Sequence, residues 1–337
     1  MPFAADSLLA DGFPGVRLHV VTGKGGTGKT TVAAALAVAL AGQGKRVLLA
    51  EVEDRQGISQ TFDVPPLPTT EVRVAGAPHG GEVIGLAVDP KAALLEYLQL
   101  FYKLGRAGGV LERFGAIDFA TTIAPGVRDV LLIGRVYEAS RRRVDKKHHR
   151  GSAPEDLAYD AIVLDAPPTG RISRFLSVGS EVAGLARVGP IRHQGDSVNE
   201  LLRSGATRVH VVTLLEEMPV QETVDAIGDL SAIGMPVGAV IINQARGADT
   251  EAVAQLDPDE LARDLRSVGL DPSPATVAGL LEQVRRQGER VTLEQKQLAV
   301  LEDLGRPLVT VPFVVEGIDL DAVTEIAGLL AEQGMVP

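Results

Sequence analysis

The fold is decided by residues 16–53, which read VRLHVVTGKGGTGKTTVAAALAVALAGQGKRVLLAEVE. A short apolar run at 16–21 leads into a glycine-rich turn, and the alanine- and leucine-rich stretch after it predicts a helix from about Lys29 to Ala41. Gly42 and Gly44 end that helix, and a second apolar run starts at Arg46. The order strand, turn, helix, strand is a βαβ unit, which favours a parallel sheet with a right-handed crossover.

Five further apolar runs of strand length follow, and helical patterns lie between most of them. Runs that are apolar on both faces are typical of parallel strands buried on both sides. We therefore predict an α/β fold, a single doubly wound and mostly parallel sheet of the P-loop NTPase type, within a domain that spans residues 16–336. A helical lobe is expected at about 90–140, a second helical segment at about 251–306 and a last helix at 318–334. The five runs are 83–88, 161–164, 209–214, 237–242 and 308–311.

Composition excludes several classes of protein. The chain has 337 residues, no cysteine and a formal net charge of −11. The lack of cysteine rules out disulfides, thiol nucleophiles, iron–sulfur clusters and cysteine zinc sites. The negative net charge argues against electrostatic binding of the protein as a whole to nucleic acid or to an anionic membrane. The N-terminus does not read as a signal peptide, and no stretch reaches the ~18 apolar residues of a spanning helix. We expect a cytoplasmic protein with no transmembrane segment and no nucleic-acid partner.

The phosphate-binding motif is the strongest functional signal. Residues 23–30, GKGGTGKT, satisfy G-x-x-x-x-G-K-[ST] between a predicted strand and a predicted helix. Backbone N–H groups must converge on phosphate oxygens there, and side chains at the glycines would block them. Lys29 is expected to reach the β- and γ-phosphates, and the Thr30 hydroxyl to ligate Mg²⁺. The predicted cofactors are therefore ATP and Mg²⁺. The loop residues expected to bind ATP are Gly23, Lys24, Gly25, Gly26, Thr27, Gly28, Lys29, Thr30 and Thr31.

A second lysine, Lys24, directly follows the first glycine of the loop. The sequence GKGGTGKT resembles the deviant Walker A motif shared by the partition ATPases, dinitrogenase reductase and the arsenite-pump ATPase. In that family the extra lysine reaches across a dimer interface to the partner's phosphates. The resemblance implies that Lys24 is catalytic and acts across a dimer, as an arginine finger does. The alternative is an exposed loop lysine.

A candidate metal residue ends another predicted strand. Residues 160–170 read DAIVLDAPPTG, and Asp165 lies at the carboxyl end of the apolar run, where a carboxylate supports Mg²⁺. An aspartate that caps the next helix is the alternative. The segment DAPPTGRISRFL resembles the switch II signature of the arsenite-pump ATPase and of the guided-entry ATPase for tail-anchored proteins. Pro168, Thr169 and Gly170 match that switch, whereas Arg171 and Ile172 depart from its histidine and threonine.

Residues 48–66, LLAEVEDRQGISQTFDVPP, resemble the first switch of the same family. The alignment places Glu53 at the family's water-orienting aspartate, so Glu53 is the candidate catalytic carboxylate. A surface acidic loop and a catalytically weak switch are the alternatives, and Asp54 is the neighbour that could substitute. By the same resemblance, Asn243 lies at the adenine ring and the loop containing Pro312 and Phe313 covers the base. We therefore identify the chain as resembling the arsenite-pump and guided-entry ATPase family over nearly its whole length.

The known cargoes of that family are disfavoured. We do not expect arsenite as the cargo, because thiolates bind it and the chain has none. The C-x-x-C zinc clasp of the guided-entry ATPase is absent from the sequence too. Only four methionines are present, so a methionine-rich client groove is not expected. Residues 90–140 could line a groove, although packing on the sheet is the favoured interpretation. The basic stretch within 141–150 is interpreted as a solvated loop, with a docking patch for an acidic partner or anionic lipid as the alternative.

Two functions remain open from the sequence. The first is a Mg²⁺-dependent ATPase that closes as a dimer around ATP and acts on a protein partner or cargo. The second is a catalytically weak nucleotide-binding subunit of a heterodimer with a paralogue, for which the Glu53, Arg171 and Ile172 departures argue. A partition-type ATPase on DNA or membrane is a weaker third option, because residues 320–337 carry no Lys or Arg.

Overall fold

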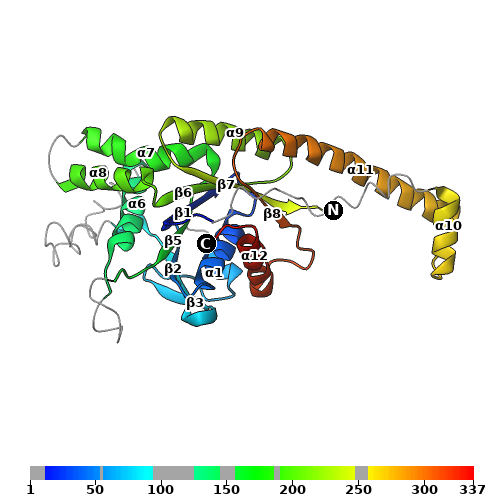
Figure 1. Cartoon of the computed structure of the whole chain (residues 1–337), viewed down its shortest axis with the longest axis horizontal. Coiled ribbons are helices and arrows are strands. Elements are labelled where there is room, and N and C mark those ends of the chain that lie inside the picture. Colours follow the sequence, from blue (N-terminus) through cyan, green and yellow to red (C-terminus); the bar gives the residue numbers. More distant parts are fainter. Residues whose placement is uncertain (1–11, 54–55, 94–124, 145–155, 186–189, 247–256) are drawn as a thin grey trace.

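One sheet organises the molecule. The structure is a computed structural model, and it describes residues 12–53, 56–93, 125–144, 156–185, 190–246 and 257–337. Within these ranges eight strands form a sheet in the order β3-β4-β2-β5-β1-β6-β7-β8 (Figure 1). Every neighbouring pair is parallel except β3 with β4. The predicted single, mostly parallel α/β sheet is confirmed.

Seven of these strands coincide with the predicted apolar runs. The eighth, β3 (Val72–Gly76), is absent from the prediction. It pairs antiparallel with β4 at the edge of the sheet, and it buries none of its residues fully. A short edge strand of this kind lacks the apolar run by which buried strands are identified. The seven are β1 (Leu18–Gly23), β2 (Arg46–Glu51), β4 (Glu82–Ala87), β5 (Ala161–Asp165), β6 (Thr207–Thr213), β7 (Val237–Ala245) and β8 (Leu308–Pro312).

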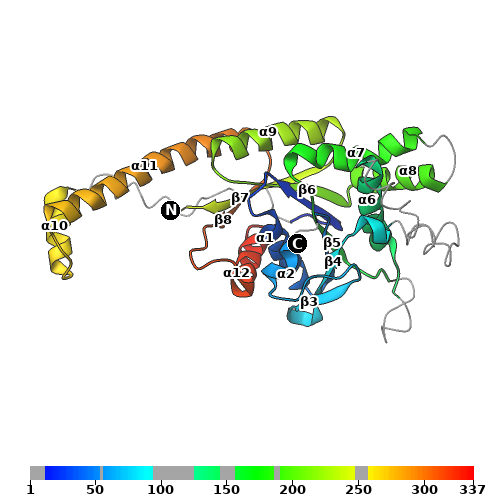
Figure 2. The ribbon, with the colours of Figure 1, turned by 180° about the vertical axis from the view of Figure 1, so that it is seen from behind.

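Helices cover both faces of the sheet. In both views α7 and α9 lie on one side of it and α1 and α12 on the other (Figures 1 and 2). The strands follow this arrangement, since Leu48 contributes to the core under α7 and α9 and Leu49 to the core under α1 and α12. Burial on both sides explains why these strands are apolar throughout. The described helices are α1 (Lys29–Ala41), α2 (Gly57–Thr61), the short 3₁₀ helix η1 (Pro78–Gly80), α6 (Pro125–Arg141), α7 (Thr169–Leu185), α8 (Pro190–Arg203), α9 (Glu217–Ala232), α10 (Pro258–Ser267), α11 (Pro274–Glu302) and α12 (Leu320–Glu332).

The two predicted helical segments are described in part. Of the lobe at 90–140, residues 94–124 lie outside the described residues, and α6 forms its C-terminal portion. The segment 251–306 contains α10 and α11, and α11 extends far beyond the sheet (Figure 1). Most of the basic loop, residues 145–155, also lies outside the described part of the chain. None of the helices described is both long enough and apolar enough to cross a bilayer.

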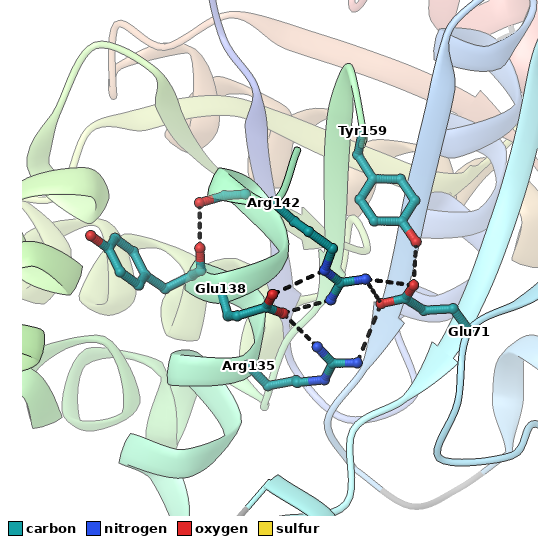
Figure 3. A network of polar contacts seen from close by, with 7 residues as sticks. Glu71, Arg135, Glu138, Arg142 and Tyr159 are labelled. Carbon is teal, nitrogen blue, oxygen red and sulfur yellow. Dashed lines mark hydrogen bonds and ion pairs between the residues drawn. The ribbon is translucent and has the colours of Figure 1, made fainter. Parts of the chain in front are cut away.

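A polar cluster fastens α6 to the sheet. Arg142 donates to Glu71 at 2.6 Å and to Glu138 at 2.5 Å, while the Tyr159 hydroxyl donates to Glu71 at 2.7 Å (Figure 3). Arg135 also pairs with both carboxylates. Burial raises the pKa of Glu71, but its bonds to Arg142 and Tyr159 outweigh burial and leave that pKa below its usual value. The cluster joins α6 to the segments just before β3 and β5.

Candidate active site

The phosphate loop lies at the carboxyl edge of the sheet, directly after β1. Since β1 is flanked by β5 and β6, the carboxyl ends of both neighbours converge on the loop. Two glycines are required by their surroundings. A Cβ at Gly23 would lie 2.1 Å from the Val212 carbonyl oxygen, and one at Gly28 would lie 2.2 Å from Nδ2 of Asn243. Gly28 also has a φ of 85°, which favours glycine.

Two side-chain hydrogen bonds fix the backbone of the phosphate loop. Thr27 is buried and its hydroxyl donates to the Lys24 carbonyl at 2.9 Å. The Asn243 amide donates to the Thr27 carbonyl at 2.8 Å. A Cβ at Gly25 or Gly26 would meet nothing within 4 Å, which leaves room for phosphate oxygens. The loop is thus braced from β7, and Asn243 contacts the phosphate loop itself.

A cation site fits at the foot of this loop. The Thr30 hydroxyl donates to Oδ2 of Asp165 at 2.5 Å. The other oxygen of Asp165, Oδ1, is buried and accepts no hydrogen bond from the residues that the structure describes. Burial raises the pKa of Asp165 to about 6; Glu51 and Glu53 add to the rise, whereas Thr30 and Lys29 oppose it. A buried carboxylate oxygen beside a hydroxyl is a donor set that suits Mg²⁺, which binds through few protein ligands plus phosphate oxygens.

Glu51 is a site residue that the sequence analysis missed. It ends β2 directly opposite Asp165 of β5 in the strand register. Its side chain is buried, and Oε1 accepts the Gly57 N–H at 3.0 Å. Glu51 thereby holds the start of α2 against Thr30, since a Cβ at Gly57 would lie 2.9 Å from the Thr30 methyl. The signal was available, because Glu51 ends an apolar run as Asp165 does.

Glu53, the candidate catalytic carboxylate, lies beside switch II. Nη1 of Arg171 lies 3.7 Å from its Oε1, and Nη2 of the same guanidinium lies 3.6 Å from Oδ1 of Asp129 in α6. The Arg171 departure therefore places a cation between the first switch and α6. The alternative carboxylate, Asp54, lies outside the described residues.

Lys24 does not point at its own phosphate loop. Its Nζ pairs with Oε1 of Glu222 in α9 at 2.6 Å. The other oxygen of Glu222 accepts the Thr169 hydroxyl of switch II at 3.1 Å. The bonds from Lys24 and Thr169 lower the pKa of Glu222, so this carboxylate stays ionised. Lys29, in contrast, is buried within the loop and donates to the Lys24 carbonyl at 3.4 Å. Sequence reasoning did not identify Glu222 as Lys24's partner.

Switch II and the expected base-covering loop complete the edge. The Pro167 carbonyl accepts the Thr22 hydroxyl at 2.7 Å, which ties switch II to the end of β1. Thr169 is buried, Pro168 is half-buried and Gly170 is exposed at the start of α7. Pro312 ends β8 and Phe313 directly follows it, and both are exposed. The guanidinium of Arg246 lies 5.0 Å from the Phe313 ring centre. Thr31 is half-buried in the first turn of α1.

Comparison with known proteins agrees with this geometry. The family model for anion-transporting ATPases matches residues 16–204, more than half of the chain. The chain belongs to the ArsA ATPase family. ATPase BagA of Mycobacterium tuberculosis is 48% identical to this ArsA family member over 328 residues, which cover 95% of this chain and 94% of BagA. A provisionally named arsenical pump-driving ATPase of Chlorobaculum tepidum is 23% identical over 269 residues, or 68% of this chain and 61% of that protein.

The family resemblance stated from the motifs is thus confirmed, as is the lack of cysteine. Nucleotide use and ATPase chemistry hold for this ArsA family member at the level of the family.

Proposed function

We propose that this chain is a Mg²⁺-dependent ATPase that closes as a dimer around ATP and transmits the change to a protein partner. The observation that carries the proposal is the Thr30–Asp165 pair, whose second Asp165 oxygen is buried and accepts no hydrogen bond within the described part of the chain, at the foot of the phosphate loop. A buried carboxylate with a raised pKa is unfavourable unless something compensates it, and a bound cation does so.

Each residue of the edge has a role in this proposal. The loop N–H groups and Lys29 bind the phosphates. Asn243 holds the phosphate loop in place through its hydrogen bond to the Thr27 carbonyl. Mg²⁺, when bound by Thr30 and Asp165, would neutralise charge on the phosphate oxygens. Glu53 orients the attacking water from the first switch. Lys24 leaves Glu222 and stabilises charge across the dimer interface.

A second candidate is a slow subunit that works beside a paralogue. The Arg171 guanidinium favours it, because it lies within ion-pair distance of Glu53 and competes with water for that carboxylate. In this alternative the chain binds ATP and supplies Lys24 to a more active partner.

The proposal also concerns the cargo of the protein and its place in the cell. Arsenite is not the proposed cargo, since the chain has no thiolate. The α6 region is the proposed output, because Asp129 of α6 lies beside Arg171 of switch II. The lack of cysteine fits a reducing compartment, so the proposal places the protein in the cytoplasm without a nucleic-acid partner.

The test is ATP turnover measured against protein concentration. A self-sufficient dimer shows specific activity that rises with concentration. Asp165→Asn, Lys29→Ala and Lys24→Ala should each lower it at least about tenfold. The matched control, Asp225→Asn, removes an exposed carboxylate of α9 whose one hydrogen-bond partner among the described residues is Gln221, and should leave activity unchanged. Binding of Mg-ATP without turnover would favour the paralogue alternative, and no binding at all would refute both.

A further inference from the structure

Among the residues that the structure describes, the longest projecting feature is an arm, residues 258–289, made of α10, a turn and the first 16 residues of α11. The end of α11 leads within a few residues into β8, so it lies at the amino edge of the sheet. Arg290 lies 3.8 Å from Glu216, just after the carboxyl end of β6. The 16 residues before Arg290 add about 24 Å of helix. The arm therefore projects past the carboxyl edge, on the side of the phosphate loop (Figure 1).

The arm is built to hold its shape. Leu265 and Val277 are buried where α10 packs on α11. Asp257 accepts the Asp259 and Glu260 N–H groups at the start of α10. Ser273 caps α11, and ion pairs such as Arg285 with Glu289 at 2.8 Å run along the projecting helix. A preorganised element loses little entropy when it binds.

Exposed apolar side chains gather at two places on this side. At the arm's tip, Val268 is 69% exposed and Leu270 is 58% exposed. On the body, Val315 is 85% exposed, Phe313 and Ile318 share its loop after β8, and the exposed Leu320 begins α12 directly after that loop. The tip and this loop lie well apart in both views, so one copy does not cover one patch with the other (Figures 1 and 2). Two such patches on one side indicate an interface.

We propose that the arm's tip, around Leu270, docks on the loop after β8, around Val315, of a second copy of this chain. This inference rests on the proposed function, in which Lys24 acts across a dimer. A copy that brings its Lys24 to this edge must approach along the arm. In a twofold dimer each copy supplies both patches, and the contact is formed twice.

The charge of the arm argues against nucleic acid or a membrane as its binding partner. Residues 258–289 contain six carboxylates and four arginines. Their net charge of about −2 (4 − 6) offers no electrostatic attraction to nucleic acid or to an anionic membrane. The contact is therefore apolar at its centre, with the charged side chains of α10 and α11 at its rim.

Cross-linking tests the contact directly, because the chain contains no native cysteine. One tagged population carries Leu270→Cys and an untagged one carries Val315→Cys. They are mixed with Mg-ATP and a short bismaleimide. We expect a hetero-cross-linked dimer. The control pairs Leu270→Cys with Val72→Cys, whose site is exposed on β3 at the far end of the sheet, and should give none.

Sedimentation separates this inference from the dimer itself. Val268→Asp and Leu270→Asp, both exposed and thus compatible with folding, should weaken the Mg-ATP-induced dimer by about tenfold or more. Fluorescent-ATP binding to the monomer should not change. A dimer that forms normally in both variants and shows no Leu270–Val315 cross-link would overturn the arm contact and leave the dimer standing. A chain that binds Mg-ATP yet remains monomeric would overturn both.

Discussion

A buried histidine pair predicts an acid-sensitive fold. His19 of β1 and His210 of β6 are buried, their rings stack, and Nδ1 of His19 lies 3.1 Å from Nε2 of His210. The Ala239 N–H donates to Nδ1 of His210 at 3.2 Å. That nitrogen must accept, so the proton of His210 is on Nε2 and is donated to His19. A further proton on either Nδ1 would meet another N–H group, and the folded state therefore requires both rings to be neutral.

The loss of folding stability at low pH can be calculated from the pKa values of the two histidines. Burial, with smaller contributions from Lys45 and Arg208, lowers the pKa of His19 to about 3, and burial also brings the pKa of His210 well below its usual value. The unfolded chain binds a proton near pH 6.5, whereas the folded chain does not, so stability falls as the pH drops from about 6.5 toward 3. For His19 alone the loss between pH 7 and pH 5 is about 1.9 kcal/mol. His210 adds a loss of the same sign.

The assay is urea unfolding of the nucleotide-free protein at pH 7 and pH 5, for the wild type and for His19→Gln. The variant is expected to be less stable at pH 7, but its further loss on acidification should be smaller by about 1.9 kcal/mol. Comparing the two losses removes contributions from carboxylates that both proteins share. His79→Gln, at an exposed position, should retain the wild-type loss. Equal losses in the wild type and in His19→Gln would refute the neutral-pair argument.

Two more predictions concern the ion pairs. Lys24 and Glu222 are 30% and 35% exposed, so their ion pair is worth roughly 0.2–1 kcal/mol. Because Glu222→Gln releases Lys24, it should strengthen Mg-ATP-induced dimerisation up to about fivefold, measured by sedimentation. A weaker dimer would show that Glu222 does not restrain the lysine. Arg142→Met removes one of the two arginines that pair with Glu71 and Glu138, leaving Arg135, and should lower the free energy of unfolding by about 1–3 kcal/mol. Arg285→Met in the exposed arm should change it by less than about 0.5 kcal/mol. Similar losses for the two variants in thermal unfolding would contradict this expectation.

Much of the fold could be predicted because its strands are buried on both faces. Apolar runs separated by helical patterns identified seven strands, and Gly42 ended α1 where expected. β3 escaped because it is a short antiparallel edge strand with exposed positions. The projection of the arm could not be predicted either. Periodicity indicates a helix in 274–302, but only tertiary contacts such as Arg290 with Glu216 show which part of that helix packs on the body.

The site was predictable where local sequence carries the chemistry. The phosphate loop needs its glycines and Lys29 in a fixed local order, so a motif is sufficient to find it. Glu51 and Asp165 each end an apolar run that forms a buried strand. The acidic residue at the end of the run identifies a site residue at Asp165, and the same signal was not applied to Glu51, so Glu51 was missed. The contacts of Lys24 with Glu222 and of Arg171 with Glu53 join residues far apart in the chain. Local sequence cannot establish such pairs.

The electrostatics of the carboxyl edge connect these observations. Glu51, Glu53 and Asp165 all end or follow neighbouring strands, and the first two raise the pKa of the third. Carboxylates gathered in this way repel one another, which destabilises the nucleotide-free fold and leaves the site in need of cations. Within one copy, Lys29 and Arg171 supply part of that charge. Lys24 is held away by Glu222. In the proposed function the remaining compensation comes from a bound cation and from a partner's lysine. Assembly of the dimer and binding of Mg-ATP should therefore be strongly coupled.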